Sequence, residues 1–363
     1  MKTGIIGLGL IGGSIARAIR RVYPDSKIVA YNRTPEVLNE AVRKGVIDES
    51  AWDITAAFGD CDYIFLCVPV VTMRTFLKKL KPVIGFSTIL TDVGSTKGNI
   101  HECVSELGLS SSFIGGHPMA GSEKTGYENS SDRLLENAWY ILTPGEEMPI
   151  EKVSAFSEFI RSLGALPLIL TNEEHDFITA AISHVPHVIS ASLVNTVHEL
   201  DNDKGYMRMI AAGGFKDITR ISSSSPQMWQ EICLANSDNI CRVLENFIRK
   251  LTDFRFAIRN EDKDKLLQYF TECKTYRESF TDEANGLYRK FYRLYMDITD
   301  EAGAIAKIAA ILADEKISLK KIGIVNNRAF EKGVLRVEFY SEETLVQALK
   351  VLEAKKYKVY RDW

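Results

Sequence analysis

Short apolar runs alternate with longer amphipathic segments along the first 170 residues. The apolar runs predict buried strands at residues 2–6, 27–31, 62–67, 87–92 and 112–116. The segments between them predict helices at residues 11–22, 35–44, 71–81 and 97–108. Strands that alternate with helices form a parallel sheet covered on both faces. With further strands near 138–142 and 166–170 around a helix at 149–163, the pattern predicts an α/β domain over residues 1–170 with a doubly wound parallel sheet.

Strand signals stop at Thr171. Helical periodicity then predicts an all-helical second domain over residues 171–285, with helices at 171–200, 204–214, 226–250 and 261–280. Phe177 to His198 contains no Asp, Glu, Lys or Arg and is long enough to span a bilayer. It also contains three histidines and Pro186, so we expect a buried helix at the centre of the domain. By analogy with oxidoreductases of this layout, the apolar faces of the domain favour a homodimer.

The hydrophobic pattern changes again after a polar stretch at residues 281–290. Residues 291–363 predict a small α+β module with the ferredoxin-like order βαββαβ. Its expected strands are 291–298, 318–326, 333–340 and 356–361, and its expected helices are 303–315 and 342–354.

Composition and charge narrow the class of protein. The chain has 363 residues, 45% hydrophobic and 26% charged, as in a soluble globular protein of two or three domains. The formal net charge is −3 and no basic stripe is visible, which argues against nucleic acid and anionic membranes as partners. The six cysteines include no CxxC pair, which favours free thiols in a reducing cytosol over a disulfide framework or a metal site. The N-terminus runs directly into a strand pattern, so we expect no signal peptide and a cytoplasmic location.

A glycine-rich turn joins the first expected strand to the first expected helix. Its residues are Gly7, Leu8, Gly9, Leu10, Ile11 and Gly12. The glycines permit a tight turn and a close approach of backbone to a pyrophosphate, and the helix N-terminus supplies N–H donors to that pyrophosphate. In this strand–turn–helix context, the GxGxxG spacing predicts a Rossmann-type dinucleotide site.

The end of the second strand bears on the choice of cofactor. Asn32, Arg33 and Thr34 stand where an acidic residue normally binds the ribose hydroxyls of NAD. A guanidinium without a neighbouring carboxylate suits the 2′-phosphate of NADP. The alternative is that Arg33 is a solvated loop residue while Asn32 still binds a ribose. We expect NADP or NAD, with a preference for NADP.

Ligands of such sheets bind at the carboxyl ends of the strands. Val68 follows the third expected strand and is a candidate for contact with the cofactor. Ser95 follows the fourth, where it could contact cofactor or substrate or only cap the next helix. His117 follows the fifth, in a loop stiffened by Pro118, where an imidazole suits proton transfer. The alternative for His117 is a tight surface turn without function.

Two stretches of the helical domain carry further candidates. His184 and His187 share a helix face beside Pro186. We expect them to form a buried, hydrogen-bonded pair. A metal-binding pair is the alternative, but no third ligand is evident in the sequence. Gly213 and Gly214 are expected to break a helix. Lys216 and Arg220, four residues apart, could grip a carboxylate-bearing substrate, although a solvated charged face is the alternative.

Five motifs together resemble the prephenate dehydrogenases of tyrosine biosynthesis. They are GLGLIGGS (7–14), DVGSTK (92–97), GGHPMAGSEKTG (115–126), SHVPH (183–187) and GGFKDITRISSSSPQMW (213–229). The resemblance covers residues 1 to about 285 and implies oxidative decarboxylation of prephenate to 4-hydroxyphenylpyruvate. It implies that His117 is the catalytic histidine and that Ser95 orients it. It further implies that Arg220 binds a substrate carboxylate, with Lys216 and His187 nearby.

The C-terminal module resembles ACT domains, which bind amino acids between paired copies. Its first strand–helix turn, with Asp300 and Gly303, is similar to their ligand turn, and tyrosine is the effector that we expect. The alternative is a module that serves only dimerisation. Two other functions stay open: arogenate dehydrogenase, and a non-catalytic NADP-binding sensor of an amino acid.

Overall fold

The computed structural model describes residues 1–363 except 55, 122–123, 283–291, 299–300, 327–332 and 362–363. The chain divides into two compact units, Met1–Thr252 and Asp253–Trp363. The first unit holds the expected sheet domain and most of the helical domain. The second holds the end of the helical domain and the C-terminal module.

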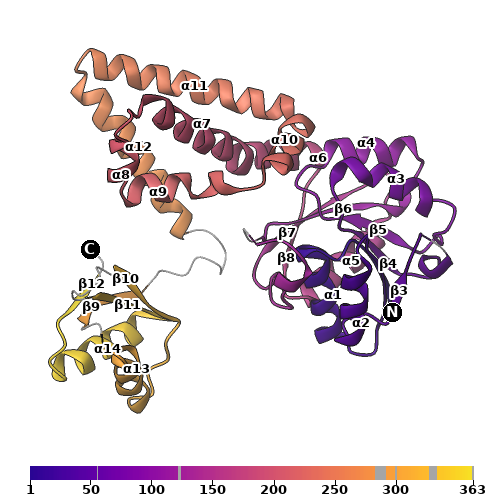
Figure 1. The fold of residues 1–363 in the computed structure, drawn as a ribbon, viewed down its shortest axis with the longest axis horizontal. Helices are drawn as coiled ribbons and strands as arrows, with labels where there is room; N and C mark the ends of the chain where they lie inside the picture. Colours follow the sequence, from indigo (N-terminus) through magenta and orange to yellow (C-terminus); the bar gives the residue numbers. More distant parts are fainter. Residues whose placement is uncertain (55, 122–123, 283–291, 299–300, 327–332, 362–363) are drawn as a thin grey trace. The chain divides into compact units, whose positions relative to one another are not determined.

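Five parallel strands form the main sheet of the first unit, in the order β3-β2-β1-β4-β5. They are β1 (Lys2–Ile6), β2 (Lys27–Tyr31), β3 (Glu49–Ala51), β4 (Tyr63–Leu66) and β5 (Ile89–Asp92). Helices α1 (Leu10–Val22) and α2 (Pro35–Arg43) pack on one face, and α3 (Val70–Leu80) and α4 (Gly98–Glu106) pack on the other (Figure 1). Successive residues of β1 separate the two cores, because Ile5 belongs to one and Ile6 to the other. The doubly wound sheet is therefore confirmed.

The sheet continues into a mixed extension of three strands. These are β6 (Ile114–Pro118), β7 (Trp139–Pro144) and β8 (Leu166–Ile169), and a single parallel bridge from Leu90 to Phe113 links them to β5. Strand β7 runs antiparallel to β6 and parallel to β8. Helix α5 (Ile150–Ser162) covers the extension through the same core as α1. Short 3₁₀ turns lie at Ala56–Phe58, Ser110–Ser112 and Tyr127–Asn129.

The helical part begins at α6 (Asn172–Thr179), a π-helical turn (Ala180–His184) and α7 (Val185–Leu200). Helices α8 (Tyr206–Ile210), α9 (Gly213–Thr219), α10 (Pro226–Ala235) and α11 (Ser237–Arg259) follow, with a 3₁₀ turn at Arg220–Ser223. Two expectations were wrong in detail. The helix expected at 226–250 is interrupted at Asn236, whose side chain bonds to the backbone carbonyl of Asp176. The glycine pair at 213–214 begins a helix and does not break one.

The apolar segment Asn172–Leu200 is long and apolar enough to cross a membrane by length and composition alone. Only 28% of its most apolar stretch is buried in the single chain. The expectation of a buried helix at the centre of the domain was therefore wrong for one chain by itself. The described helices of this domain do not cover all of the apolar faces, and Ile182 and Leu200 are 63% and 65% exposed.

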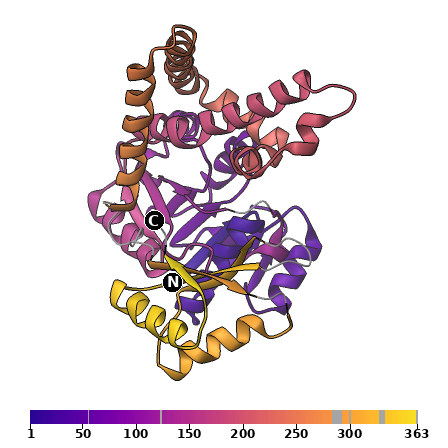
Figure 2. The ribbon, with the colours of Figure 1, turned by 90° about the vertical axis from the view of Figure 1, so that its left-hand side faces the viewer.

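The second unit contains α12 (Lys263–Asp282) and a four-stranded antiparallel sheet in the order β10-β11-β9-β12. Its elements are β9 (Tyr292–Ile298), α13 (Ala304–Asp314), β10 (Lys321–Asn326), β11 (Gly333–Phe339), α14 (Glu342–Ala354) and β12 (Val359–Arg361). Both helices cover one face of the sheet, where Leu294, Leu312 and Leu352 are fully buried (Figures 1 and 2). The predicted βαββαβ order is confirmed.

Candidate functional site

The glycine turn between β1 and α1 has the shape of a pyrophosphate cradle. Gly7 has φ +100°, and a Cβ there would lie 2.4 Å from the carbonyl oxygen of Cys67. A Cβ on Gly12 would lie 2.0 Å from the carbonyl oxygen of Gly7, whereas a Cβ on Gly9 would meet nothing within 4 Å. Gly7 and Gly12 are thus required by the turn and by helix packing, and Gly9 borders open space. No side chain among the described residues caps α1. A dinucleotide fits this turn, because free N–H groups at a helix N-terminus favour phosphate.

Asn32 and Arg33 differ sharply in their surroundings. The Asn32 amide oxygen accepts a hydrogen bond from the N–H of Leu8 at 3.0 Å, and its amide nitrogen donates to the carbonyl of Thr34 at 3.2 Å. Asn32 therefore holds the glycine turn against the end of β2. Arg33 is exposed, and its guanidinium makes no hydrogen bond or ion pair within the described part of the chain.

His117 lies in β6, which passes close to the end of β5. Gly115 and Gly116 permit this approach, because a Cβ on Gly116 would lie 2.5 Å from the carbonyl oxygen of Asp92. The imidazole of His117 is partly buried, and its Nδ1 lies 2.8 Å from Nε2 of His175 on α6. Nδ1 of His175 in turn lies 2.7 Å from Oδ1 of Asp176. The structure thus places an imidazole–imidazole–carboxylate chain at the end of β6.

His175 and Asp176 were missed in the sequence. Their local signal is a capping box, in which Thr171 and Glu174 exchange hydrogen bonds and fix the start of α6. The box indicates that the following His–Asp pair stands on the first turns of a helix. Nothing local indicates that this turn faces a strand 58 residues earlier in the chain.

A buried ion pair joins the end of β5 to the far end of the loop that carries Ser95. Lys97 and Asp92 are both fully buried, and Lys97 Nζ lies 2.5 Å from Asp92 Oδ2. The Asp92 carboxylate also accepts hydrogen bonds from the N–H groups of Gly94 and Gly116. At the other end of this loop, Asp176 accepts the N–H groups of Lys97 and Gly98, each at 2.8 Å. The loop that carries Ser95 is therefore held at both ends by carboxylates.

Burial governs the protonation of these groups. Burial first, and then the nearby His175 and Lys97, hold the pKa of His117 well below its usual value, so the ring is neutral at physiological pH. Burial acts to raise the pKa of Asp176, but hydrogen bonds from His175, Gly98 and Lys97 outweigh it and lower that pKa. Burial lowers the pKa of Lys97 against the attraction of Asp92. A neutral imidazole backed by a carboxylate is suited to accept a proton.

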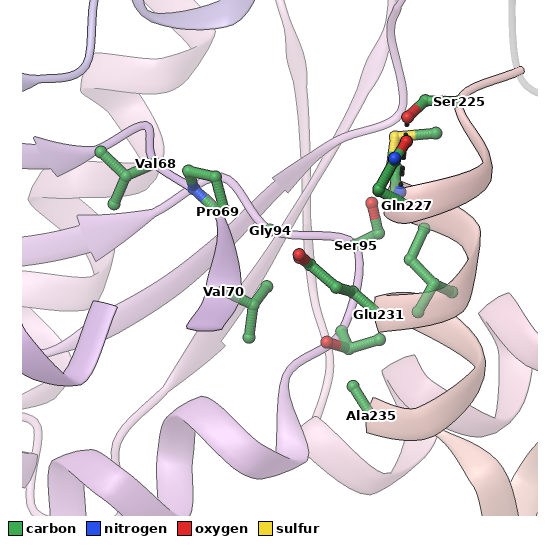
Figure 3. Close-up of a pocket in the computed structure, with 12 residues that line it drawn as sticks. Val68, Pro69, Val70, Gly94, Ser95, Ser225, Gln227, Glu231 and Ala235 are labelled. Atoms are coloured by element: carbon green, nitrogen blue, oxygen red, sulfur yellow. Dashed lines mark hydrogen bonds between the residues drawn. The ribbon is translucent and has the colours of Figure 1, made fainter. Parts of the chain in front are cut away.

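Ser95 lines a cavity of about 390 Å³ between the strand ends and α10. Figure 3 shows Val68, Pro69, Gly94 and Ser95 on one side of the cavity and Ser225, Gln227 and Glu231 on the other. Within the described residues, Ser95 makes no hydrogen bond to His117, whose ring partner is His175. Val68 and Ser95 thus share one cavity, while the orientation of His117 by Ser95 stays a prediction.

The candidates for substrate binding are dispersed. His187 stacks on Trp229 with ring centroids 3.7 Å apart and borders a second cavity. Lys216 is exposed and borders a third. Arg220 is exposed at the start of its 3₁₀ turn. None of these three cavities unites the three side chains with His117. The expected pairing of His184 with His187 is also absent from the described contacts, because His184 bonds to Asn236.

Gly303 caps α13 with φ +89° and borders a cavity with Glu301, Ile305 and Ile324. Asp300, the other expected regulatory residue, lies outside the described residues. Among the residues that the structure describes, no group of three or more His, Cys, Asp or Glu side chains is arranged to hold a metal ion.

Comparison with known proteins gives consistent matches along the chain. Residues 15–168 match the family model of the prephenate dehydrogenase nucleotide-binding domain, and residues 171–272 match that of the prephenate dehydrogenase dimerization domain. The chain is 38% identical to prephenate dehydrogenase of Bacillus subtilis, over 98% of this chain and 97% of the relative. It is 33% identical to cyclohexadienyl dehydrogenase of Zymomonas mobilis, over 75% of this chain and 94% of the relative.

Solved structures agree with these matches. Prephenate dehydrogenase of A. aeolicus, in complex with hydroxyphenyl propionate and NAD+, matches with a TM-score of 0.73 and 33% identity. That match covers 77% of this chain and 98% of the other. Arogenate dehydrogenase of Synechocystis matches with a TM-score of 0.71 and 29% identity, over 77% of this chain and 100% of the other.

Proposed function

This chain belongs to the prephenate dehydrogenase family of oxidoreductases, and we propose that it converts prephenate to 4-hydroxyphenylpyruvate in tyrosine biosynthesis. The observation that carries the proposal is the placement of His117. It is a neutral imidazole at the strand ends, backed by His175 and Asp176, and adjoining the loop of Ser95. The names of the relatives from B. subtilis and A. aeolicus favour prephenate over arogenate.

Different residues of the chain bind the cofactor and accept the proton of the substrate. A bound nicotinamide supplies the acceptor for the hydride that leaves ring carbon C4. The glycine turn holds the pyrophosphate, and Val68 and Ser95 line the cavity beside it. His117 accepts the hydroxyl proton through Nε2 as the C4–O bond becomes a carbonyl. Loss of CO₂ from C1 then returns an electron pair through the ring to that oxygen, which recovers the proton as a phenol.

Arg220, with Lys216 and His187, is the proposed site for the carboxylates of prephenate. A guanidinium binds a carboxylate with two parallel hydrogen bonds, which gives both energy and orientation. His187 and Lys216 border two different cavities, and Arg220 is exposed at the start of its 3₁₀ turn. The proposal therefore requires closure of this region around the substrate, or a contribution from a second copy.

A homodimer is the proposed assembly in the cytoplasm. The continuous helical segment Asn172–Leu200 leaves large apolar side chains exposed, among them Phe177, Ile182 and Leu200. Contiguous apolar surface on a soluble protein marks an interaction site. A second copy of the chain would cover this face, as the matched dimerization-domain model favours.

The C-terminal module is proposed to be an ACT domain that senses tyrosine. Its support is the βαββαβ order and the cavity beside Gly303 at the start of α13. The chemistry proposed above uses none of its residues. Feedback by the end product of the pathway would account for a module appended to a complete enzyme.

The test is an assay of purified protein with prephenate or arogenate and with NAD or NADP. We expect prephenate to give one reduced cofactor, one CO₂ and one 4-hydroxyphenylpyruvate per turnover. Faster turnover of arogenate would transfer the assignment to arogenate dehydrogenase, the activity named for the Synechocystis relative. Cofactor binding without turnover of either substrate would leave the non-catalytic sensor.

A further inference from the structure

We infer that His175 and Asp176 are positioning residues that set the tautomer of His117 and the place of the loop that carries Ser95. The inference rests on the proposed role of His117 as the base. His175 is fully buried and Asp176 is 5% exposed, and both belong to α6, outside the motifs that indicated the site. Neither residue needs to touch the substrate to act in this way.

The tautomer follows from the direction of the hydrogen bonds. Asp176 is a carboxylate, so it only accepts, and the nitrogen of His175 that faces it must carry a proton. When the His175 ring is neutral, its Nε2 carries the lone pair and accepts a hydrogen bond from Nδ1–H of His117. Nε2 of His117 is consequently the ring nitrogen with the free lone pair. A His117 ring of the other tautomer would present an N–H to the hydroxyl and could not accept its proton.

The same carboxylate also fixes the cofactor side of the site. Oδ1 of Asp176 accepts the N–H of Lys97 as well as His175, and Oδ2 accepts the N–H of Gly98. Three donors from two different elements therefore converge on one side chain. Because the Ser95 loop and the base share this anchor, their relative position is set by a single residue.

The charge of the Asp176 carboxylate also affects His117 through His175. When His117 takes up the proton, its Nδ1–H bond to His175 becomes charge-assisted, and Asp176 stabilises the result through His175. Burial and three nearby ionisable groups act to lower the pKa of His117: His175 itself, Lys97 on the α4 side, and His184 in the π turn. Asp92 is engaged by Lys97.

The first test compares His175→Leu with His175→Gln. Leucine removes the acceptor, so kcat should fall roughly 10- to 100-fold, less than the loss of the base itself, with KM nearly unchanged. The acid limb of the pH profile of kcat/KM should also move, because His175 is one of the groups that set the pKa of His117. Glutamine offers a carbonyl near the position of Nε2 and should restore part of kcat. Glu151→Gln, at an exposed residue of α5, is the control and should match the wild type.

A double-mutant cycle separates positioning from a structural effect. If His175 acts through His117, adding His175→Leu to His117→Asn should cost little further activity. Equal costs in both backgrounds, or an unmoved acid limb in His175→Leu, would show that His175 is only part of the core.

A measurement independent of turnover keeps the inference distinct from the proposed function. The chain has six histidines, so ¹⁵N-histidine labelling and single substitutions can assign each ring by NMR. We expect His117 and His175 both to carry the proton on Nδ1. A His117 ring protonated on Nε2 would overturn the inference even in an active enzyme. If the protein is inactive but its histidines show the expected tautomers, the inference stands and only the proposed reaction is contradicted.

Discussion

At the scale of single residues, Arg33 and Asn32 illustrate how neighbours at one strand end differ in function. The Asn32 amide is occupied by the glycine turn and by Thr34, while Arg33 projects from the surface beside them. A 2′-phosphate would be bound by Arg33 through a charge-assisted hydrogen bond. Such bonds contribute about 1.5–3 kcal/mol, or roughly 10- to 100-fold in affinity.

Arg33→Ala should therefore raise KM for NADP by that factor and leave KM for NAD almost unchanged. Initial rates with each cofactor at saturating prephenate provide the measurement, and Arg33→Lys, which keeps the charge, should lose less. Equal losses with both cofactors would remove the argument for a 2′-phosphate site.

Sequence could indicate those side chains whose neighbours along the chain carry the signal. Gly7 and Gly12 are spaced as their turn requires, and His117 was expected in a stiff loop at the end of a strand, although the structure places it within β6. His175 and Asp176 gave no such signal, because their contacts reach across 58 and 79 residues to His117 and Lys97. Asn32 was expected to contact the cofactor, with a bond to the ribose as the alternative, and its bond to Leu8 depends on how β2 meets the turn.

At the scale of elements, the connection from β5 to α4 depends on a buried ion pair. Lys97 and Asp92 are fully buried, and the carboxylate also holds the N–H groups of Gly94 and Gly116. Removing one member of such a pair leaves an uncompensated charge in the core, which costs about 3–5 kcal/mol.

Lys97→Met should lower the free energy of unfolding by about that amount, as measured by urea denaturation. The matched control is Lys79→Met, which breaks the exposed pair with Asp53 and should change stability little. If the two variants unfold alike, the buried pair does not hold this connection.

Helix boundaries show where periodicity fails as a guide. The apolar period continues through residues 226–250, but Asn236 ends α10 because its side chain bonds to the carbonyl of Asp176 and lies 3.2 Å from Nδ1 of His184. Strand β3, with only Glu49, Ser50 and Ala51, lacks the apolar run that marks a strand. In both cases tertiary contacts override the local pattern.

At the scale of the whole molecule, the order of domains was predictable from changes in period along the chain. The exposure of α7 was not, because composition does not distinguish a helix buried in its own chain from one that a second copy would cover. The two compact units also bear on regulation. The proposed tyrosine sensor lies in Asp253–Trp363, whereas the proposed catalytic groups lie in Met1–Thr252.

A chain that ends at residue 287 should retain activity with prephenate and lose inhibition by tyrosine. Coupling between an effector site and an active site is typically ~1–3 kcal/mol, so in the full chain tyrosine should weaken prephenate binding by roughly 5- to 150-fold. Rates measured against tyrosine concentration for both chains provide the comparison. Undiminished inhibition of the shorter chain would place the tyrosine effect at the active site, where tyrosine resembles the product.

The most direct test of the account is the turnover number of His117→Asn with prephenate and the preferred cofactor. Asparagine keeps a polar side chain in β6 but cannot accept the hydroxyl proton as a base. We predict that kcat falls by about 10²- to 10⁴-fold, the usual contribution of a general base, while KM changes little. A variant with nearly the wild-type kcat would contradict the assignment of His117 and the mechanism built on it.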